Sequence, residues 1–196
     1  MSSPLTLVTS PPNAAAQEEM DLVVQALHDP AAFRQLYERY ATPVYRYLYS
    51  FVQEYTDPRA IAEDLTSQVF LTVLEDLPQL RDRARFVPWM FAIARSKVMN
   101  YFRGTRREVA LDEALEQSGD SDILSAAIRQ DQIERARRLI RTLSADDREL
   151  IRLRYVAELS FADMAQVLGR KEDAVKKALY RLLARLQQQL EEADHA

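Results

Sequence analysis

Apolar residues recur every three or four positions from Glu18 almost to the end of the chain, without the sustained alternation that marks β-strands. One stripe begins just after Asp29 and Pro30, a pair typical of a helix cap and first turn. Its members, at i, i+3, i+4 and i+7, are Phe33, Leu36, Tyr37 and Tyr40. The pattern predicts an all-α protein in which each helix buries one face.

Prolines bound the next two predicted helices. We expect Pro43 to restart the chain, so that the stripes on either side of it belong to separate helices. Asp57 and Pro58 repeat the cap pattern and begin a helix that is predicted to end near Glu75. The apolar face assigned to this helix consists of Ile61, Leu65, Val69, Phe70, Val73 and Leu74.

Glycines and capping boxes divide the rest of the chain. A helix over about residues 87–102 is expected to stop near Gly104, and a short helix over residues 161–168 is expected to stop at Gly169. Serine followed three residues later by aspartate begins the helices after residues 144 and 160. A further helix is expected around residues 133–142, and a long one after residue 171.

Composition along the chain indicates two small helical domains joined by an acidic linker. Residues 1–17, rich in Pro, Ser, Thr and Ala, are predicted to be a disordered leader, and residues 108–130 are the best candidate for the linker. The domains are then expected over residues 18–107 and 131–192. No targeting or membrane segment is visible, so we expect a cytoplasmic protein without membrane insertion.

The amino-acid composition argues against several kinds of chemistry. The 196 residues include no cysteine and only two histidines, His28 and His195, so a metal site or a catalytic triad is not expected. With only Gly104, Gly119 and Gly169, no phosphate-binding loop of the GxGxxG or GxxxxGK type can be written. We predict no cofactor and no enzymatic activity.

The net charge of −4 conceals two basic islands in an acidic chain. Residues 1–80 hold 4 basic and 11 acidic side chains, whereas residues 81–107 hold 8 basic side chains and only Asp82. Residues 170–186 form the second island, with 6 basic and 2 acidic side chains. Solvated helix faces are one explanation for an island, but two islands that coincide with motifs favour a nucleic-acid partner.

The second island lies in a helix-turn-helix pattern over residues 160–185, with a short helix, a glycine turn and a longer helix. The second helix of such a unit lies in the major groove of DNA. Its basic residues, placed to contact bases and phosphates, are Lys171, Lys176, Lys177 and Arg181. A plain helical hairpin is the alternative interpretation of this spacing.

The first island combines a loop of arginines with a helix in which cations and aromatic rings alternate. The cations are Arg81, Arg83 and Arg85 in the loop, then Arg95, Lys97, Arg103, Arg106 and Arg107. The aromatic residues are Phe86, Trp89, Phe91, Tyr101 and Phe102. Proteins that bind single strands stack bases on such rings beside a cationic track. For Trp89, Phe91 and Phe102 taken individually, packing in the core is favoured over base stacking.

Several runs of sequence resemble a known family. The first half contains AEDLTSQVFLTVLEDLPQL, FVPWMFAIAR and YFRGTRR, and the second half contains LSADDRELIRLRYVAELSFADMAQVLGRKEDAVKKALYRLLARL. Together they resemble a bacterial sigma factor of the sigma-70 family, extracytoplasmic-function group, reduced to its second and fourth regions. The resemblance covers about residues 30–107 and 133–187, in the family's order.

The resemblance implies a role for each segment. The helix over residues 62–70 would dock on the clamp helices of the largest subunit of RNA polymerase, through Glu63, Asp64, Ser67 and Gln68. The loop over residues 77–85 would capture a flipped base of the −10 element, and the next helix would follow the melted strand. The implied −10 residues are Arg81, Arg83, Arg85, Trp89, Arg95, Ser96, Lys97, Asn100 and Arg103. The implied −35 residues are Lys171, Glu172, Asp173, Lys176, Lys177 and Arg181.

The chain departs from the family pattern where bases would be read. Ser96 stands where relatives usually have Asn, and Asn100 where they often have Asp. Relatives commonly run Gly-Thr-Val-Lys-Ser-Arg into the recognition helix, whereas residues 173–178 here are Asp-Ala-Val-Lys-Lys-Ala. Glu172 and Asp173 would face a polyanion, although a carboxylate can accept a hydrogen bond from cytosine N4.

Three hypotheses follow, and they differ in their partners. The first is a sigma factor, which is not an enzyme and which binds core polymerase at the clamp helices and the flap, promoter DNA, and an anti-sigma factor as a further candidate partner. The alternative is a stand-alone helix-turn-helix regulator that binds duplex operators without polymerase. The third is a helical adaptor or anti-sigma-like protein, in which charge reversal of the two islands would leave function intact.

Overall fold

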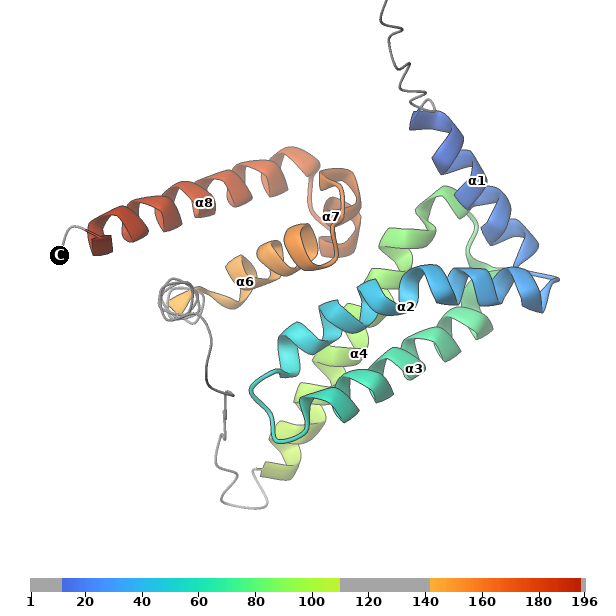
Figure 1. Cartoon of the computed structure of the whole chain (residues 1–196), viewed down its shortest axis with the longest axis horizontal. Helices are drawn as coiled ribbons and strands as arrows, with labels where there is room; N and C mark the ends of the chain where they lie inside the picture. Colours follow the sequence, from blue (N-terminus) through green and yellow to red (C-terminus); the bar gives the residue numbers. More distant parts are fainter. Residues whose placement is uncertain (1–11, 110–141, 195–196) are drawn as a thin grey trace, which may run out of the picture.

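The computed structural model of the chain describes residues 12–109 and 142–194, and these residues form helices joined by short turns (Figure 1). The first half contains α1 (Pro12–Gln25), α2 (Pro30–Val52), α3 (Pro58–Asp76) and α4 (Phe86–Val109). Two short 3₁₀ turns, η1 (Leu77–Gln79) and η2 (Arg83–Arg85), connect α3 to α4. The second half contains α6 (Ala145–Ile151), the π-helical turn η3 (Arg152–Val156), α7 (Phe161–Leu168) and α8 (Glu172–Asp194).

No strand occurs in the described ranges, so the predicted all-α fold is confirmed. Most of the predicted linker and of the helix expected around residues 133–142 lies outside the described residues. Within the described helices, none combines the length and the apolar character needed to cross a membrane.

Side-chain caps begin four of the helices where the sequence predicts. The Asp29 carboxylate accepts a hydrogen bond from the Ala31 amide at 2.8 Å, and Asp57 accepts one from Ala60 at 3.2 Å. The hydroxyls of Ser144 and Ser160 each accept a hydrogen bond at 3.1 Å from the amide three residues later. These caps satisfy amide groups that the first turn of a helix leaves without a partner.

Two predicted helix breaks, at Pro43 and at Gly104, are wrong. Pro43 lies inside α2, whose buried residues Leu36, Val44 and Leu48 lie on both sides of it. A proline interrupts one backbone hydrogen bond, but the apolar face that continues across it still packs on α3. Gly104 likewise lies inside α4, which continues to Val109.

The start of the chain also differs from the expectation. Helix α1 begins at Pro12, so residues 12–17 are helical where the sequence predicts a disordered leader. Proline at the first helical position has no amide to leave unsatisfied. Further along, Leu22 and Val23 are buried in the contact of α1 with α2, and this packing stabilises the helix.

Helices α2, α3 and α4 form a bundle, and the helices of the second half pack on one side of it (Figure 1). The apolar core is continuous across both halves. It runs from residues such as Leu36, Val69 and Phe91 to Met164 and Leu179. Direct contacts join α4 to α7 and α2 to η3, so the two halves share an interface.

The turn between α7 and α8 requires glycine. Gly169 has φ of 62°, in the left-handed region, and the following amide, of Arg170, donates to the Ala165 carbonyl at 2.9 Å. This arrangement ends α7 and sets the direction in which α8 leaves, as the helix-turn-helix pattern predicts.

The two described glycines provide a matched pair of substitutions. Neither Gly104 nor Gly169 has an atom within 4 Å of the position that a Cβ would occupy. Gly169→Ala should lower the free energy of unfolding by about 1 kcal/mol because alanine is strained in the left-handed region. Gly104→Ala should raise it by about 0.5–1 kcal/mol because alanine favours a helix interior. Urea denaturation measures both, and shifts of the same sign would contradict this account.

Candidate nucleic-acid interface

The loop between α3 and α4 is organised around one arginine. The Arg83 guanidinium donates to the Leu77 carbonyl at 2.7 Å and also to the Leu80 carbonyl. Asp82 accepts from the Ala84 amide at 3.2 Å and forms an ion pair of 3.0 Å with Arg85. Arg83 therefore braces the loop from within.

The other two loop arginines point outward. Arg81 and Arg85 are exposed at the surface of the loop. The arginines predicted to contact DNA here thus divide into one that shapes the loop and two that solvent can reach.

One face of α4 carries a polar stripe. Ser96, Asn100 and Arg103 are all exposed, at spacings of four and three residues. The Arg103 guanidinium donates to the Asn100 side-chain carbonyl. Trp89, seven residues before Ser96, is half-buried on the same side of the helix, and Lys97 is half-buried at its flank. These residues together form a continuous surface next to the loop.

The aromatic residues of the first island all pack on the core, two of them fully buried. Phe86 and Phe91 are fully buried. The ring of Phe102 packs against Tyr55 with centroids 5.7 Å apart. Trp89, whose ring centroid lies 6.1 Å from that of Phe86, is half-buried, as are Tyr101 and Phe102.

Arg95, whose side chain is 41% exposed, lies beside the stripe and pairs with the second half of the chain. Its Nε lies 3.3 Å from Oε1 of Glu149 in α6, and the same carboxylate oxygen accepts a hydrogen bond of 2.7 Å from the Tyr47 hydroxyl of α2. Tyr47 is fully buried and Glu149 is 5% exposed. Burial raises the pKa of Tyr47, and the nearby Glu149 carboxylate raises it further.

Arg152 adds a second connection between the halves. Its guanidinium donates to the Ser50 carbonyl at 3.2 Å and lies 3.9 Å from the centre of the Phe51 ring. Burial lowers the pKa of Arg152. Sequence reasoning missed Glu149, Tyr47 and Arg152 as contact residues, because these partners are about a hundred positions apart and lie on separate motifs.

Helix α8, the predicted recognition helix, presents both charged side chains and an aromatic ring. Lys177 and Arg181 are exposed, as are Lys171, Glu172 and Asp173 at its start. Lys176 forms an ion pair of 2.9 Å with Glu172 and lies 5.6 Å from the centre of the Phe161 ring. The hydrogen bond and charge of Glu172 raise the pKa of Lys176. Glu172 therefore neutralises much of the charge of this lysine.

Tyr180 is a residue of this face that the charge pattern does not reveal. It lies four positions after Lys176, one turn along the same side of α8, and is 60% exposed. It lies outside the buried seam of Val175 and Leu179.

The α3 strip, defined as Glu63, Asp64, Ser67 and Gln68, is exposed along its whole length. Gln68 donates to the Asp64 carboxylate at 2.7 Å, and the Ser67 hydroxyl donates to the Glu63 backbone carbonyl at 3.0 Å. Leu71 and Leu74 extend the strip and are 59% and 52% exposed. Leu74 was assigned to the buried face from the sequence, and that assignment is wrong.

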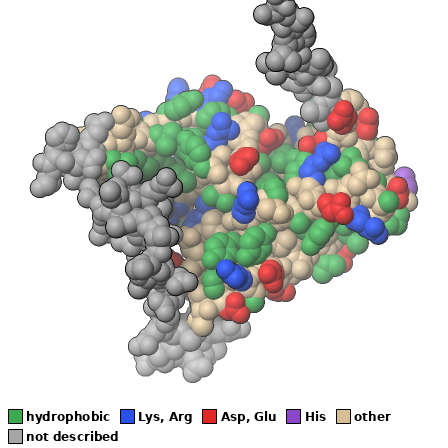
Figure 2. Space-filling model, viewed as in Figure 1, with side chains coloured by type: hydrophobic (Ala, Val, Ile, Leu, Met, Phe, Trp, Pro, Cys, Tyr) green, Lys and Arg blue, Asp and Glu red, His purple; other side chains and the backbone are tan. Residues whose placement is uncertain are grey.

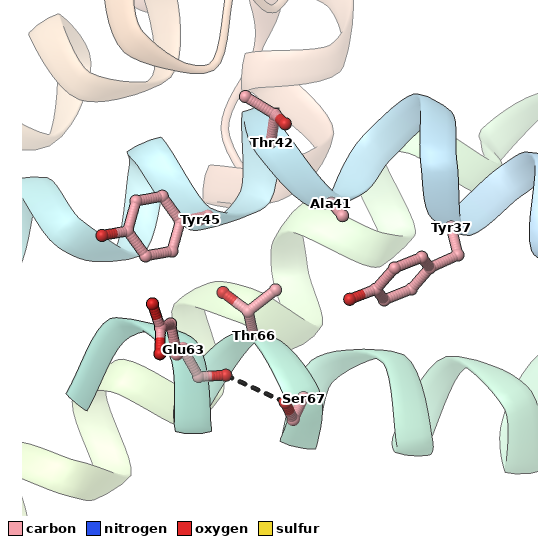
Figure 3. A pocket seen from close by; sticks show the side chains of 7 residues that line it. All are labelled: Tyr37, Ala41, Thr42, Tyr45, Glu63, Thr66 and Ser67. Carbon is pink, nitrogen blue, oxygen red and sulfur yellow. Dashed lines mark hydrogen bonds between the residues drawn. The ribbon is translucent and has the colours of Figure 1, made fainter. Parts of the chain in front are cut away.

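A shallow hollow of about 230 Å³ adjoins the strip, between α2 and α3 (Figure 3). Tyr37 and Tyr45 flank it from α2, and Glu63, Thr66 and Ser67 line it from α3. On the molecular face shown in Figure 2, acidic and basic side chains are interspersed with apolar ones. The described residues hold no group of three His, Asp or Glu that could bind a metal ion.

Comparison with known proteins identifies relatives for both halves. The family description sigma-70 region 2 matches residues 36–108, and sigma-70 region 4 matches residues 133–186. The ECF RNA polymerase sigma factor BldN of Streptomyces coelicolor is 34% identical over 176 residues, which cover 85% of this chain and 64% of BldN. The ECF RNA polymerase sigma factor SigD of Mycobacterium tuberculosis is 32% identical over 192 residues, covering 95% of this chain and 91% of SigD.

A solved structure shares the fold. CnrH, in complex with the cytosolic domain of CnrY, superposes with a TM-score of 0.63 at 24% identity. The match covers 89% of this chain and 97% of CnrH.

The buried Tyr47 hydroxyl predicts a loss of stability in alkali. Because its pKa is higher in the folded chain than the ordinary value of 10.0, the folded state holds the proton more tightly. Its contribution is complete below pH 10.0 and is lost as the pH rises through the higher folded pKa. Tyr47→Phe, which cannot titrate, should show a shallower decline above pH 10.0 in urea denaturation. Parallel declines in both proteins would contradict the assignment.

Proposed function

The chain belongs to the sigma-70 family, in its extracytoplasmic-function group, and from this we propose how its residues divide the work of directing RNA polymerase core enzyme to promoters. Sigma factors are non-enzymatic factors of transcription initiation. The observation that carries the proposal is the succession of regions 2 and 4, in the family's order, on the two helical halves. The domain limits of residues 18–107 and 131–192, with a linker between them, are part of this proposal.

The α3 strip is assigned to docking on the clamp helices of the largest polymerase subunit. Its carboxylates are exposed, and Gln68 holds the Asp64 carboxylate in one orientation, which lowers the entropy lost on binding a basic partner. Exposed Leu71 and Leu74 supply apolar area beside the charges. A helical coiled coil with basic and apolar residues on one side fits this combination.

The braced loop and the α4 stripe are assigned to the −10 element. Unstacking a base costs a few kcal/mol, and a preformed pocket with phosphate contacts must offset that cost. Arg83 preforms the loop, while Arg81 and Arg85 remain exposed for phosphates. Ser96, Asn100 and Arg103, with Trp89, then lie along the path of the melted strand.

Helix α8 is assigned to the −35 element as duplex DNA. Lys177 and Arg181 are exposed toward the groove side, and Lys176 would exchange its Glu172 partner for a phosphate. Glu172 would then be released to accept a hydrogen bond from cytosine N4. The exposed carboxylate of Asp173 would be a second acceptor of the same kind. The binding of Lys176 to a phosphate would thus free Glu172 to contact a base.

Two further assignments complete the proposal. The CnrH structure contains the cytosolic domain of CnrY, and by analogy we assign an anti-sigma partner to this chain as well. The work of a transcription factor places the protein in the cytoplasm. The alternative of a stand-alone regulator is not favoured, because the first half matches region 2 rather than a ligand-binding or dimerisation domain.

Reconstitution with core polymerase tests the assignment of docking. The wild-type chain should initiate transcription from a subset of genomic promoter fragments, and Asp64→Arg should abolish its capture by core enzyme because it places a cation against a basic partner. Glu38→Arg makes the same charge change at an exposed site of α2 and serves as the control. Full binding of the Asp64 variant would refute the docking site, and a wild-type chain inactive on every fragment would refute the function.

Substitutions of lysine test the assignment of the recognition helix. Lys177→Ala and Lys176→Ala should each weaken −35 duplex binding by the holoenzyme by about 1–3 kcal/mol. Lys97→Ala removes the same charge from α4 and should leave −35 binding unchanged. Electrophoretic mobility shifts with a −35 duplex at several salt concentrations measure all three. An equal loss in the Lys97 variant would show a general charge effect instead.

A further inference from the structure

A hydrogen bond connects the first helix of the chain to the bundle. The Tyr40 hydroxyl of α2 donates to the Glu19 carboxylate of α1 at 2.6 Å. Both side chains are half-buried, so the bond is partly shielded from water. Burial raises the pKa of Tyr40, and its hydrogen bond to Glu19 raises it further, so the hydroxyl keeps its proton at neutral pH. Because a hydrogen bond is directional, it fixes the position of α1 along α2 more closely than apolar packing alone.

Helix α1 also supports the loop that is assigned to the −10 element. It contacts η2, the 3₁₀ turn at the end of that loop, and lies beside the connection between α3 and α4 (Figure 1). Its buried residues Leu22 and Val23 belong to the same apolar core as Phe86, the residue at which η2 passes into α4. The position of α1 therefore affects the position of the loop.

Tyr40 contacts the same junction from α2. Its ring centroid lies 5.7 Å from that of Phe86, and the Phe86 ring in turn lies 6.1 Å from that of Trp89. Phe86 is fully buried, and its amide donates to the Arg83 carbonyl at the end of η2. A displacement of Tyr40 would therefore move the ring that joins the loop to Trp89.

The loop depends on such support because it has little regular structure of its own. A 3₁₀ turn of three residues such as η2 contains few hydrogen bonds. Arg81 and Arg85 are exposed, and Arg83 braces the loop from within. A loop that captures an unstacked base binds it best if it is already in the binding geometry, since ordering the loop during capture would cost free energy.

We propose that Glu19 and Tyr40 form a positioning pair for the −10 loop, in which their hydrogen bond holds α1 against η2 and so sets the loop and Trp89 to receive the unstacked base. The inference rests on the proposed function for the assignment of the loop to the −10 element. The match to sigma-70 region 2 begins at residue 36, beyond the end of α1, and gives Glu19 no role. Neither residue would contact DNA. The effect of the pair falls on strand opening, because the loop acts once a base has left the stack.

Four substitutions separate the hydrogen bond from the charge and from the ring. Glu19→Ala removes the acceptor and keeps a residue that favours a helix. Tyr40→Phe removes the donor and keeps the ring that packs on Phe86. Glu19→Gln retains an acceptor without the charge. Glu18→Ala removes the same charge from an exposed position of α1 and is the matched control.

Fluorescence of Trp89 tests the support of the loop without DNA or polymerase, because Trp89 is the only tryptophan of the chain. Glu19→Ala and Tyr40→Phe should each increase the quenching of Trp89 by acrylamide. The double variant should show no further increase, because each substitution removes the same bond. Glu19→Gln and Glu18→Ala should both match the wild type.

Kinetics of open-complex formation test the positioning role. The probe is a promoter fragment from which the wild-type holoenzyme initiates transcription. Glu19→Ala and Tyr40→Phe should lower the rate constant of strand opening about fivefold, the factor that corresponds to an average hydrogen bond. The affinity of the initial closed complex should not change, because binding of the −35 duplex by α8 does not use the loop. Glu19→Gln should restore most of the rate of strand opening.

Each outcome decides one part of the proposal. Unchanged quenching in both Glu19→Ala and Tyr40→Phe overturns the support of the loop by α1, and Tyr40→Phe alone decides if Glu19→Ala loses helicity by circular dichroism. Increased quenching with an unchanged rate of strand opening overturns the positioning role, as does an equal loss of rate in Glu18→Ala. The quenching measurement contains no polymerase, so a wild-type chain that initiates from no fragment refutes the proposed function separately.

Discussion

Tyr47 is the residue on which the arrangement of both halves depends. Its ring packs edge-on against Phe51 and Phe91, with centroids 5.1 and 5.5 Å apart, so it helps to hold α2 against α4. Its hydroxyl cannot remain unpaired in such a core, because a buried polar group without a hydrogen bond is costly. Glu149 supplies the acceptor from the other half of the chain. One side chain thus joins the bundle that positions α3 and α4 to the helix that precedes the helix-turn-helix.

Local sequence signals predicted the fold well for features that depend on residues close together in the chain. The caps at Asp29, Asp57, Ser144 and Ser160 and the left-handed Gly169 depend on residues within one turn, and the structure has them where they were expected. Gly104 was misjudged because a glycine inside a helix costs only about 1 kcal/mol, which α4 tolerates. Pro43 was misjudged because packing outweighs its local effect. The apolar face of α2 continues across Pro43 and packs on α3, and that contact is not visible in a window of a few residues.

The candidate surfaces were predicted only in part: the exposure of side chains was predicted, whereas their partners were not. Exposure of the α3 strip and of Ser96, Asn100 and Arg103 follows from helical periodicity alone, because each lies opposite a buried face. The partners of Arg83, Arg95 and Lys176 do not follow from helical periodicity. Arg83 turns back on its own loop, Lys176 pairs with Glu172, and Arg95 meets a residue in the other half. Charge counting locates cations but does not say which are already neutralised.

The use of a carboxylate at this interface, rather than an apolar side chain, has a physical consequence. An apolar contact of similar size would hold the halves more firmly, since buried ion pairs add little net stability compared with well-packed hydrophobic groups. The apolar core that continues from Phe91 of α4 to Met164 of α7 also joins the halves. The hydrogen bond from Tyr47 to Glu149 therefore adds direction to an apolar contact, because it forms in only one arrangement of the two halves.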